Sequence, residues 1–117
     1  MSKVDFELII TIVERGHSDA VVESTRKVGA GGGTIIYGRG TGEKEHGSIL
    51  GVSLQPEKEM IFTLVFSKDK TKTMDAIVEG ANLTKEGNGM CFSLPVLNVA
   101  GISRLIAEQQ EKNNHKK

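Results

Sequence analysis

The chain has 117 residues, with 15 basic and 15 acidic side chains and a formal net charge of zero. This length fits a single domain, and the balanced charge argues against binding duplex DNA or an anionic membrane surface. Apolar residues make up 38% of the chain and Trp is absent, so we expect a small two-layer domain with a core of Val, Ile, Leu and Phe. The 14 glycines accompany only two prolines, which excludes a collagen repeat and a low-complexity linker.

The single cysteine, Cys91, excludes an internal disulfide and a cysteine-based zinc cluster. Its apolar neighbours predict a buried structural thiol within a strand rather than a nucleophile. The N-terminus lacks a basic start followed by an apolar run, and no window approaches the roughly 20 apolar residues of a membrane span. We therefore expect a cytoplasmic protein.

In chain order, the first predicted element is a strand over residues 4–13. Apolar and polar side chains alternate there with a period of two, which is typical of a strand with one buried face. The apolar positions of this alternation are Val4, Phe6, Leu8, Ile10 and Ile12. We expect these residues to face the core.

A helix is predicted next, after a turn at Gly16 and His17. Ser18 is its expected N-cap, because a serine hydroxyl accepts a hydrogen bond from a free N–H group of the first turn. Apolar residues recur at helical spacing until Gly29, which supplies the stop. A short second strand is expected over 34–37.

Residues 40–57 form the predicted long loop. They lack apolar periodicity, and a loop of this length inside a compact domain is usually functional. Alternation resumes over 60–66 as a third strand, and a second helix, begun at 68–70, carries a narrow apolar stripe. The last predicted strand runs over 90–96.

The order strand, helix, strand, strand, helix, strand is that of the split strand-helix-strand unit. It predicts an α+β, ferredoxin-like βαββαβ fold, in which two helices cover one face of a four-stranded antiparallel sheet. On the other face we expect Ile9, Val13, Ile36, Ile61 and Val65. This set is too apolar for solvent, so we expect an oligomer to bury it.

One domain over residues 1–110 is expected, followed by a polar tail over 111–117. The apolar pattern of residues 102–110 fits a helix and a further strand equally well. Both alternatives stay open.

Few side chains are arranged for catalysis or metal binding. His17, His46 and His115 are scattered over a turn, a loop and the tail, and we expect all three at the surface. Paired carboxylates, a Ser-His-Asp order and metal-ligand spacing do not stand out. The sequence therefore predicts neither an enzyme nor a metal site. The weakest alternative is a small enzyme using Lys85 or His46 as an acid-base group.

Two glycine clusters are candidates for ligand binding. Gly38-x-Gly40-x-Gly42 resembles a dinucleotide fingerprint, but it leads into a polar loop instead of a helix whose N-terminus would hold a pyrophosphate. Gly87 and Gly89 are better candidates, because bare backbone N–H groups can form an anion-binding nest. A helix C-cap followed by a turn explains these two glycines without a ligand.

Residues 81–96, ANLTKEGNGMCFSLPV, resemble the PII signal-transduction (nitrogen regulatory protein P-II) family, whose segment usually reads A-R-T-G-K-x-G-D-G-K-I-F-V-x-P-V. The matching residues are Ala81, Lys85, Gly87, Gly89, Phe92, Pro95 and Val96. Gly38 and Gly40 are similar to the glycines at the base of the family's effector loop, and Lys58 stands where the family has a lysine opening the third strand. With the element order over 4–96, the chain resembles a divergent PII-like protein.

The resemblance implies a homotrimer that binds ATP or ADP between subunits, without a tightly bound cofactor, and often 2-oxoglutarate beside the ATP. The nucleotide contacts that it implies are Gly38, Arg39, Gly40, Thr41, Lys85, Gly87, Asn88 and Gly89, and the implied contact of a carboxylate effector is Lys58. It further implies that loop 40–57 acts on a target such as a membrane transporter or a metabolic enzyme. Neither catalysis nor nucleic acid is implied.

Some positions depart from the family pattern. Met90 replaces a lysine expected on the phosphates, and Asn88 replaces an aspartate. Loss of the lysine charge weakens binding of a triphosphate most. Thr41 and Gly42 replace Arg and Gln, although Arg39 lies two residues before the missing arginine. We therefore expect the effector to be an adenine nucleotide or another small anion.

Two functions from different classes follow. The leading one is a PII-like regulator of nitrogen or other metabolic signalling that controls a partner protein through loop 40–57. The alternative is a structural or interaction trimer of the same fold that has lost nucleotide binding. Loop 40–57 contains no Tyr, which excludes uridylylation at tyrosine, and Ser48 and Ser53 have no recognisable context for modification.

Overall fold

The computed structural model describes residues 5–30, 32–40, 47–49, 52–54 and 57–101. Its elements are, in chain order, β1 (Phe6–Glu14), α1 (Ser18–Lys27), β2 (Thr34–Arg39), β3 (Gly47–Ile49), β4 (Val52–Leu54), β5 (Glu57–Phe66), the short 3-10 helix η2 (Ser67–Asp69), α2 (Lys70–Gly80) and β6 (Gly89–Val96). Thr41, His46, His115, the segment 102–110 and the tail 111–117 lie outside the described residues.

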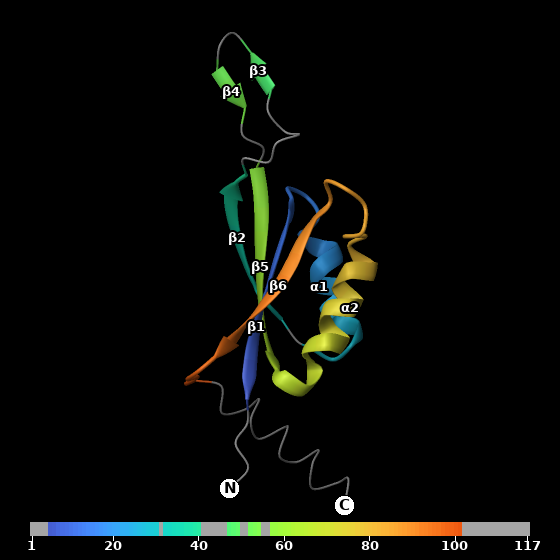
Figure 1. Cartoon of the computed structure of the whole chain (residues 1–117), viewed down its shortest axis with the longest axis vertical. Coiled ribbons are helices and arrows are strands. Elements are labelled where there is room, and N and C mark those ends of the chain that lie inside the picture. The colour runs from blue at the N-terminus through green and yellow to red at the C-terminus, as the bar shows by residue number, and fades with distance from the viewer. Residues whose placement is uncertain (1–4, 31, 41–46, 50–51, 55–56, 102–117) are drawn as a thin grey trace, which may run out of the picture.

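The main sheet has four antiparallel strands in the order β2-β5-β1-β6. β1 is central because both of its sides are largely apolar, and it pairs along its length with β5 and with β6. Figure 1 shows α1 and α2 together on one face of this sheet. The predicted α+β, ferredoxin-like architecture is therefore confirmed.

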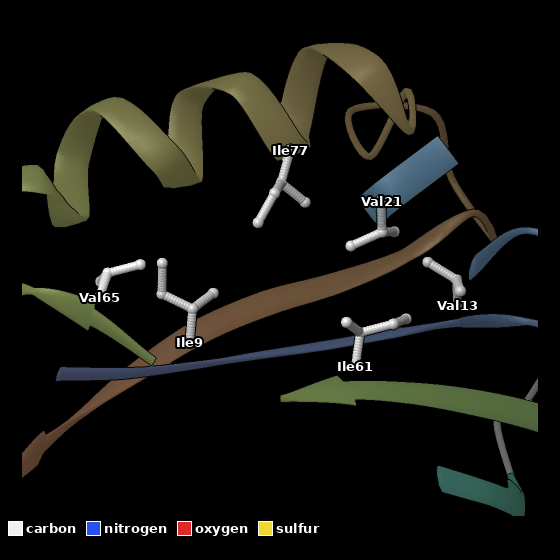
Figure 2. Close-up of a cluster of buried hydrophobic side chains, with 6 residues drawn as sticks. All are labelled: Ile9, Val13, Val21, Ile61, Val65 and Ile77. Carbon is white, nitrogen blue, oxygen red and sulfur yellow. The ribbon is translucent and has the colours of Figure 1, made fainter. Parts of the chain in front are cut away.

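The core lies between the sheet and the two helices. It consists of Ile9, Val13, Val21, Ile61, Val65 and Ile77. In Figure 2 the side chains from β1 and β5 point toward those from α1 and α2. We call the sheet face beneath the helices the helix-covered face, and the opposite one the open face.

This core reverses the sides that the sequence analysis assigned to the first and third strands. Ile9, Val13, Ile61 and Val65, expected away from the helices, lie beneath them, and the alternate positions such as Leu8 turn to the open face. Both sides of these strands carry large apolar residues, and the polar residues on the covered side are mostly buried threonines and a capping glutamate, so alternation alone does not distinguish the sides. The side with smaller β-branched residues and two buried threonines, Thr11 and Thr63, takes the helices.

The open face is apolar, as predicted, but is built from larger side chains. Of the residues expected there, Ile36 was assigned correctly, since it pairs with Met60 across β2 and β5. The most exposed apolar side chains on this face are Ile36, Met90, Phe92 and Leu94, at 41%, 57%, 38% and 47%. A contiguous apolar face of this kind marks an interaction surface.

The segment 40–57 contains a hairpin where a loop was predicted. β3 and β4 pair antiparallel, from Gly47 opposite Leu54 to Ile49 opposite Val52, as a separate two-stranded sheet. Figure 1 shows this hairpin beyond the end of the main sheet, where β2 ends and β5 begins. We call residues 40–57 the arm.

The two helices approach each other closely near the end of α2. The Ser24 hydroxyl donates to the carbonyl oxygen of Ala20 at 2.7 Å, and a Cβ atom on Gly80 would lie 1.8 Å from the Ser24 Oγ atom. Gly80 therefore permits this helix contact.

α1 and α2 have 10 and 11 residues, and no helix in the described ranges is long and apolar enough to cross a membrane.

Candidate functional site at one end of the sheet

The two predicted ligand-binding segments lie at the same end of the sheet. β2 closes with Gly38 and Arg39, while the turn containing Gly87 and Gly89 leads into β6. Because the strands are antiparallel, the ends of β1 and β2 meet the starts of β5 and β6, as Figure 1 shows. The arm leaves from this end as well.

Within one chain, however, these segments occupy opposite edges of the sheet. β2 and β6 are the edge strands, with β5 and β1 between them. Three spacings of about 4.8 Å separate their backbones by roughly 14 Å. A single phosphate or carboxylate group therefore contacts only one of the two segments in the same chain.

Lys58 lies on the open face of β5, next to the edge strand β2, and its backbone is opposite Gly38 of β2 on one side and Glu14 of β1 on the other. A Cβ atom on Gly40 would lie 2.6 Å from the Lys58 Cε atom. The lysine stem thus rests against the backbone at Gly40, which is the first residue of the arm. A side chain at position 40 would displace the Lys58 stem from this place.

The turn before β6 is held by its own hydrogen bonds. Asn82 has a positive φ of 52°, and its carbonyl oxygen accepts a 2.9 Å bond from the Asn88 side-chain amide. The backbone N–H of Asn88 donates to the carbonyl oxygen of Lys85 at 3.2 Å. Asn88 therefore stabilises the turn with the groups that a phosphate contact would use.

Gly89 is needed by the sheet itself. Its φ is 138°, and a Cβ atom there would lie 2.2 Å from the carbonyl oxygen of Ile12 on β1. Gly87 also has a positive φ, of 89°, without any atom near its missing side chain. The turn explanation therefore accounts for both glycines, and the anion-binding nest stays a prediction. Lys85 is exposed beside them.

A residue that the sequence analysis missed, Glu59, caps the first helix. It is only 5% exposed, and its Oε1 atom accepts hydrogen bonds from the backbone N–H groups of Gly16 and Ser18 at 2.7 and 3.3 Å. Ser18, predicted as the N-cap, is instead the first helical residue, and His17 in the cap position makes no capping side-chain bond. The sequence feature that could have indicated this cap is the carboxylate of Glu59 among the apolar residues on the same face of the strand.

A pocket of about 580 Å³ opens beside this cap on the helix-covered side. It is lined by Arg15, Gly16, Tyr37, Gly38, Arg39, Glu57 and Glu59. The guanidinium of Arg15 forms an ion pair with the Glu57 carboxylate. None of Arg15, Tyr37 and the two glutamates was predicted as a site residue, because strands far apart in the sequence bring them together.

Cys91, predicted as a buried structural thiol, lies within β6 and is half-buried. Burial raises its pKa, and a hydrogen bond donated by the Thr11 hydroxyl to its Sγ atom at 3.6 Å opposes part of that rise. The thiol is therefore protonated at neutral pH and is a poor nucleophile. His17 is exposed as predicted, and no cluster of metal-ligating side chains occurs in the described part of the chain.

Comparisons with known proteins agree with this fold. The family model for nitrogen regulatory protein P-II matches residues 6–105. The crystal structure of Arabidopsis thaliana PII bound to citrate is similar, with a TM-score of 0.63 and 26% sequence identity over 85% of this chain and 84% of that one. No curated protein matches by sequence. The chain therefore belongs to the nitrogen regulatory protein P-II family, whose members are regulators and not enzymes.

Proposed function

We propose that the protein is a PII-like homotrimeric regulator that binds an adenine nucleotide or a similar small anion between subunits. Its bound state would act through the arm, residues 40–57, on a target such as a membrane transporter or a metabolic enzyme of the cytoplasm. The observation that carries this proposal is the separation of the two predicted ligand-binding segments onto opposite edges of the sheet. Only a neighbouring chain can bring such edges together.

The open face supports the trimer. Phe92 and Leu94 lie on it with more than a third of their surface exposed, and full burial of one such side chain contributes about 1.5–3 kcal/mol. Association through this face would place the β2 edge of one subunit beside the β6 edge of the next. Lys58 of one chain would then share a cleft with Lys85 of its neighbour.

Three features support a small anion as the ligand. Lys58 and Lys85 supply positive charge, while Met90 supplies none where the family has a lysine, which favours fewer phosphates. The related Arabidopsis PII is bound to citrate, a small polyanion. The lysine stem of Lys58 rests on Gly40, so a ligand at Lys58 would act at the root of the arm.

Isothermal titration calorimetry with ATP, ADP, AMP, cyclic nucleotides, 2-oxoglutarate and citrate tests this proposal. We expect at least one nucleotide to bind. Lys85→Gln should weaken that binding by about tenfold, the effect of one charge-assisted hydrogen bond. Lys68→Gln is the matched control, because Lys68 is an exposed lysine in η2 at the other end of the sheet. The absence of heat with all ligands at millimolar concentration would refute the sensor function.

The alternative function is a structural trimer without a ligand. Asn88 and Gly89 favour it, since both have roles in the fold that need no bound anion. It predicts an oligomer of unchanged mass whose melting temperature responds to none of these ligands. Gly89 is not a suitable probe, because any side chain there meets the carbonyl oxygen of Ile12.

A further inference from the structure

Three neighbouring strands end in a row of charged side chains on the helix-covered side. Arg39 at the end of β2 stands directly opposite Glu57 at the start of β5. Arg15, just after β1, donates its backbone N–H to the Glu57 carbonyl oxygen at 3.2 Å, and its guanidinium pairs with the Glu57 carboxylate. The Glu57 carboxylate is therefore paired with the Arg15 guanidinium, and the strand register sets a second arginine, Arg39, opposite Glu57.

The second carboxylate of the pocket does not neutralise this row. Glu59 is buried and directs its Oε1 atom to the backbone N–H groups of Gly16 and Ser18. These donors and the positive end of α1 compensate its charge. Two arginines and two glutamates line the pocket, but the Glu59 carboxylate is bound by these backbone donors, so Glu57 is the carboxylate that competes with a ligand for the arginines.

The shape of the pocket fits a small ligand. The outer strands of the row, β2 and β1, are separated by β5, so their backbones lie about 10 Å apart. Guanidinium groups bind carboxylate and phosphate oxygens in pairs, and Tyr37, 73% exposed, adds a phenolic donor to the lining. A volume of about 580 Å³ is ordinary for a metabolite site.

We propose that this pocket is a second ligand site, which holds a small multivalent oxyanion, a phosphate or a dicarboxylate, between Arg15 and Arg39. The site is distinct from the one under Proposed function, and it does not rest on it. Successive residues of a strand point to opposite faces, and the register places Arg39 and Lys58 on opposite faces of the sheet end. The glycine turn before β6 belongs to the other edge.

Occupancy of the pocket acts on the arm. Glu57 is the residue at which the arm rejoins the main sheet, and Arg15 ties it to the turn between β1 and α1. An oxyanion that binds the Arg15 guanidinium competes with the Glu57 carboxylate for it. The ligand therefore loosens one attachment of the arm root.

Calorimetric titration of the full chain with inorganic phosphate and with succinate, at fixed low ionic strength, tests the site. We expect one or both to bind the wild type, and Arg39→Gln to weaken that binding at least tenfold, with partial recovery in Arg39→Lys. Arg26→Gln is the matched control, since Arg26 is an exposed arginine paired with Glu23 on α1. Circular dichroism verifies that each variant is folded.

Comparing the affinities of the two probes shows which kind of oxyanion the pocket prefers. Tighter binding of inorganic phosphate indicates a phosphate ligand, and tighter binding of succinate indicates a dicarboxylate. Lys85→Gln removes the charge of the proposed nucleotide site, so a loss caused by Arg39→Gln that is equally large in the Lys85→Gln background belongs to the pocket. The proposal is overturned if neither probe binds the wild type, or if Arg39→Gln binds as tightly as Arg26→Gln.

Discussion

The helix-covered face and the open face belong to the same four strands but differ in the size of their side chains. Beneath the helices lie isoleucine, valine and two buried threonines, whereas the other side has phenylalanine, leucine and methionine in addition to isoleucine. Small β-branched residues let the helices approach the sheet closely, while large exposed apolar side chains suit contact with another chain. Side-chain size, more than hydrophobicity, distinguishes the internal core from the surface offered to a partner.

Among the variants that test the difference between the two faces, Ile61→Ala should change the free energy of unfolding most. Ile61 is completely buried on the helix-covered face, so truncation leaves a cavity and should lower the free energy of unfolding by about 2–5 kcal/mol. Urea denaturation measures it. Leu94→Ala, on the open face, is the matched control and should affect the oligomer more than the fold of each chain. If both variants, measured as monomers, lost the same free energy of unfolding, the division between the two faces would be contradicted.

A smaller effect is expected from Gly80→Ala in the helix layer. The new Cβ atom would meet the Ser24 Oγ atom, and such overpacking destabilises by about 1–3 kcal/mol. Adding Ser24→Ala removes that oxygen and should restore part of the loss. Thermal unfolding of the two single variants and the double variant gives the coupling free energy between positions 24 and 80. Additive effects would show that the helices do not meet at this point.

Thr63→Val should stabilise the protein slightly. The Thr63 hydroxyl is buried on the helix-covered face without a hydrogen-bond partner among the described residues. Replacing it with a methyl group of the same shape removes the desolvation penalty, a gain of about 1 kcal/mol. Thr11→Val is the comparison, because it also deletes the hydrogen bond to Cys91. A loss of stability in Thr63→Val would indicate a partner for this hydroxyl.

The smallest effect is the pH dependence due to Cys91. Burial raises its pKa in the folded state, so the folded chain keeps the proton to higher pH than the unfolded chain does. This contribution to stability is complete below the unfolded pKa of about 8.5 and is lost as the pH rises through the folded pKa. Urea midpoints should therefore fall more steeply above that range for the wild type than for Cys91→Ala. Parallel curves would contradict the raised pKa.

The elements of the fold could be predicted from the sequence because their signals are local. Alternation marked the strands, and Gly29, with a positive φ of 85°, ends the first helix as expected. The sides of the strands could not be assigned, since both are apolar. The cap by Glu59 and the row of Arg15, Glu57 and Arg39 depend on residues that are distant in the sequence, so no local pattern predicts them.

The candidate site was predictable only in part, for the same reason. The element order places Gly38 and Gly89 at one end of the sheet, as the structure does. Their separation onto opposite edges and the use of Asn88 within its own turn depend on strand order and hydrogen bonds, which single residues do not reveal.

The mass of the protein in solution tests the central claim, that the open face is buried between chains, most directly. Size-exclusion chromatography with light scattering should give three times the 12.6 kDa of the chain. Leu94→Ser, which places a hydroxyl on the open face, should shift that mass toward the monomer while the fold persists. A wild-type protein that remains monomeric at high concentration would contradict the account, because the two edges proposed to bind the ligand could then not meet.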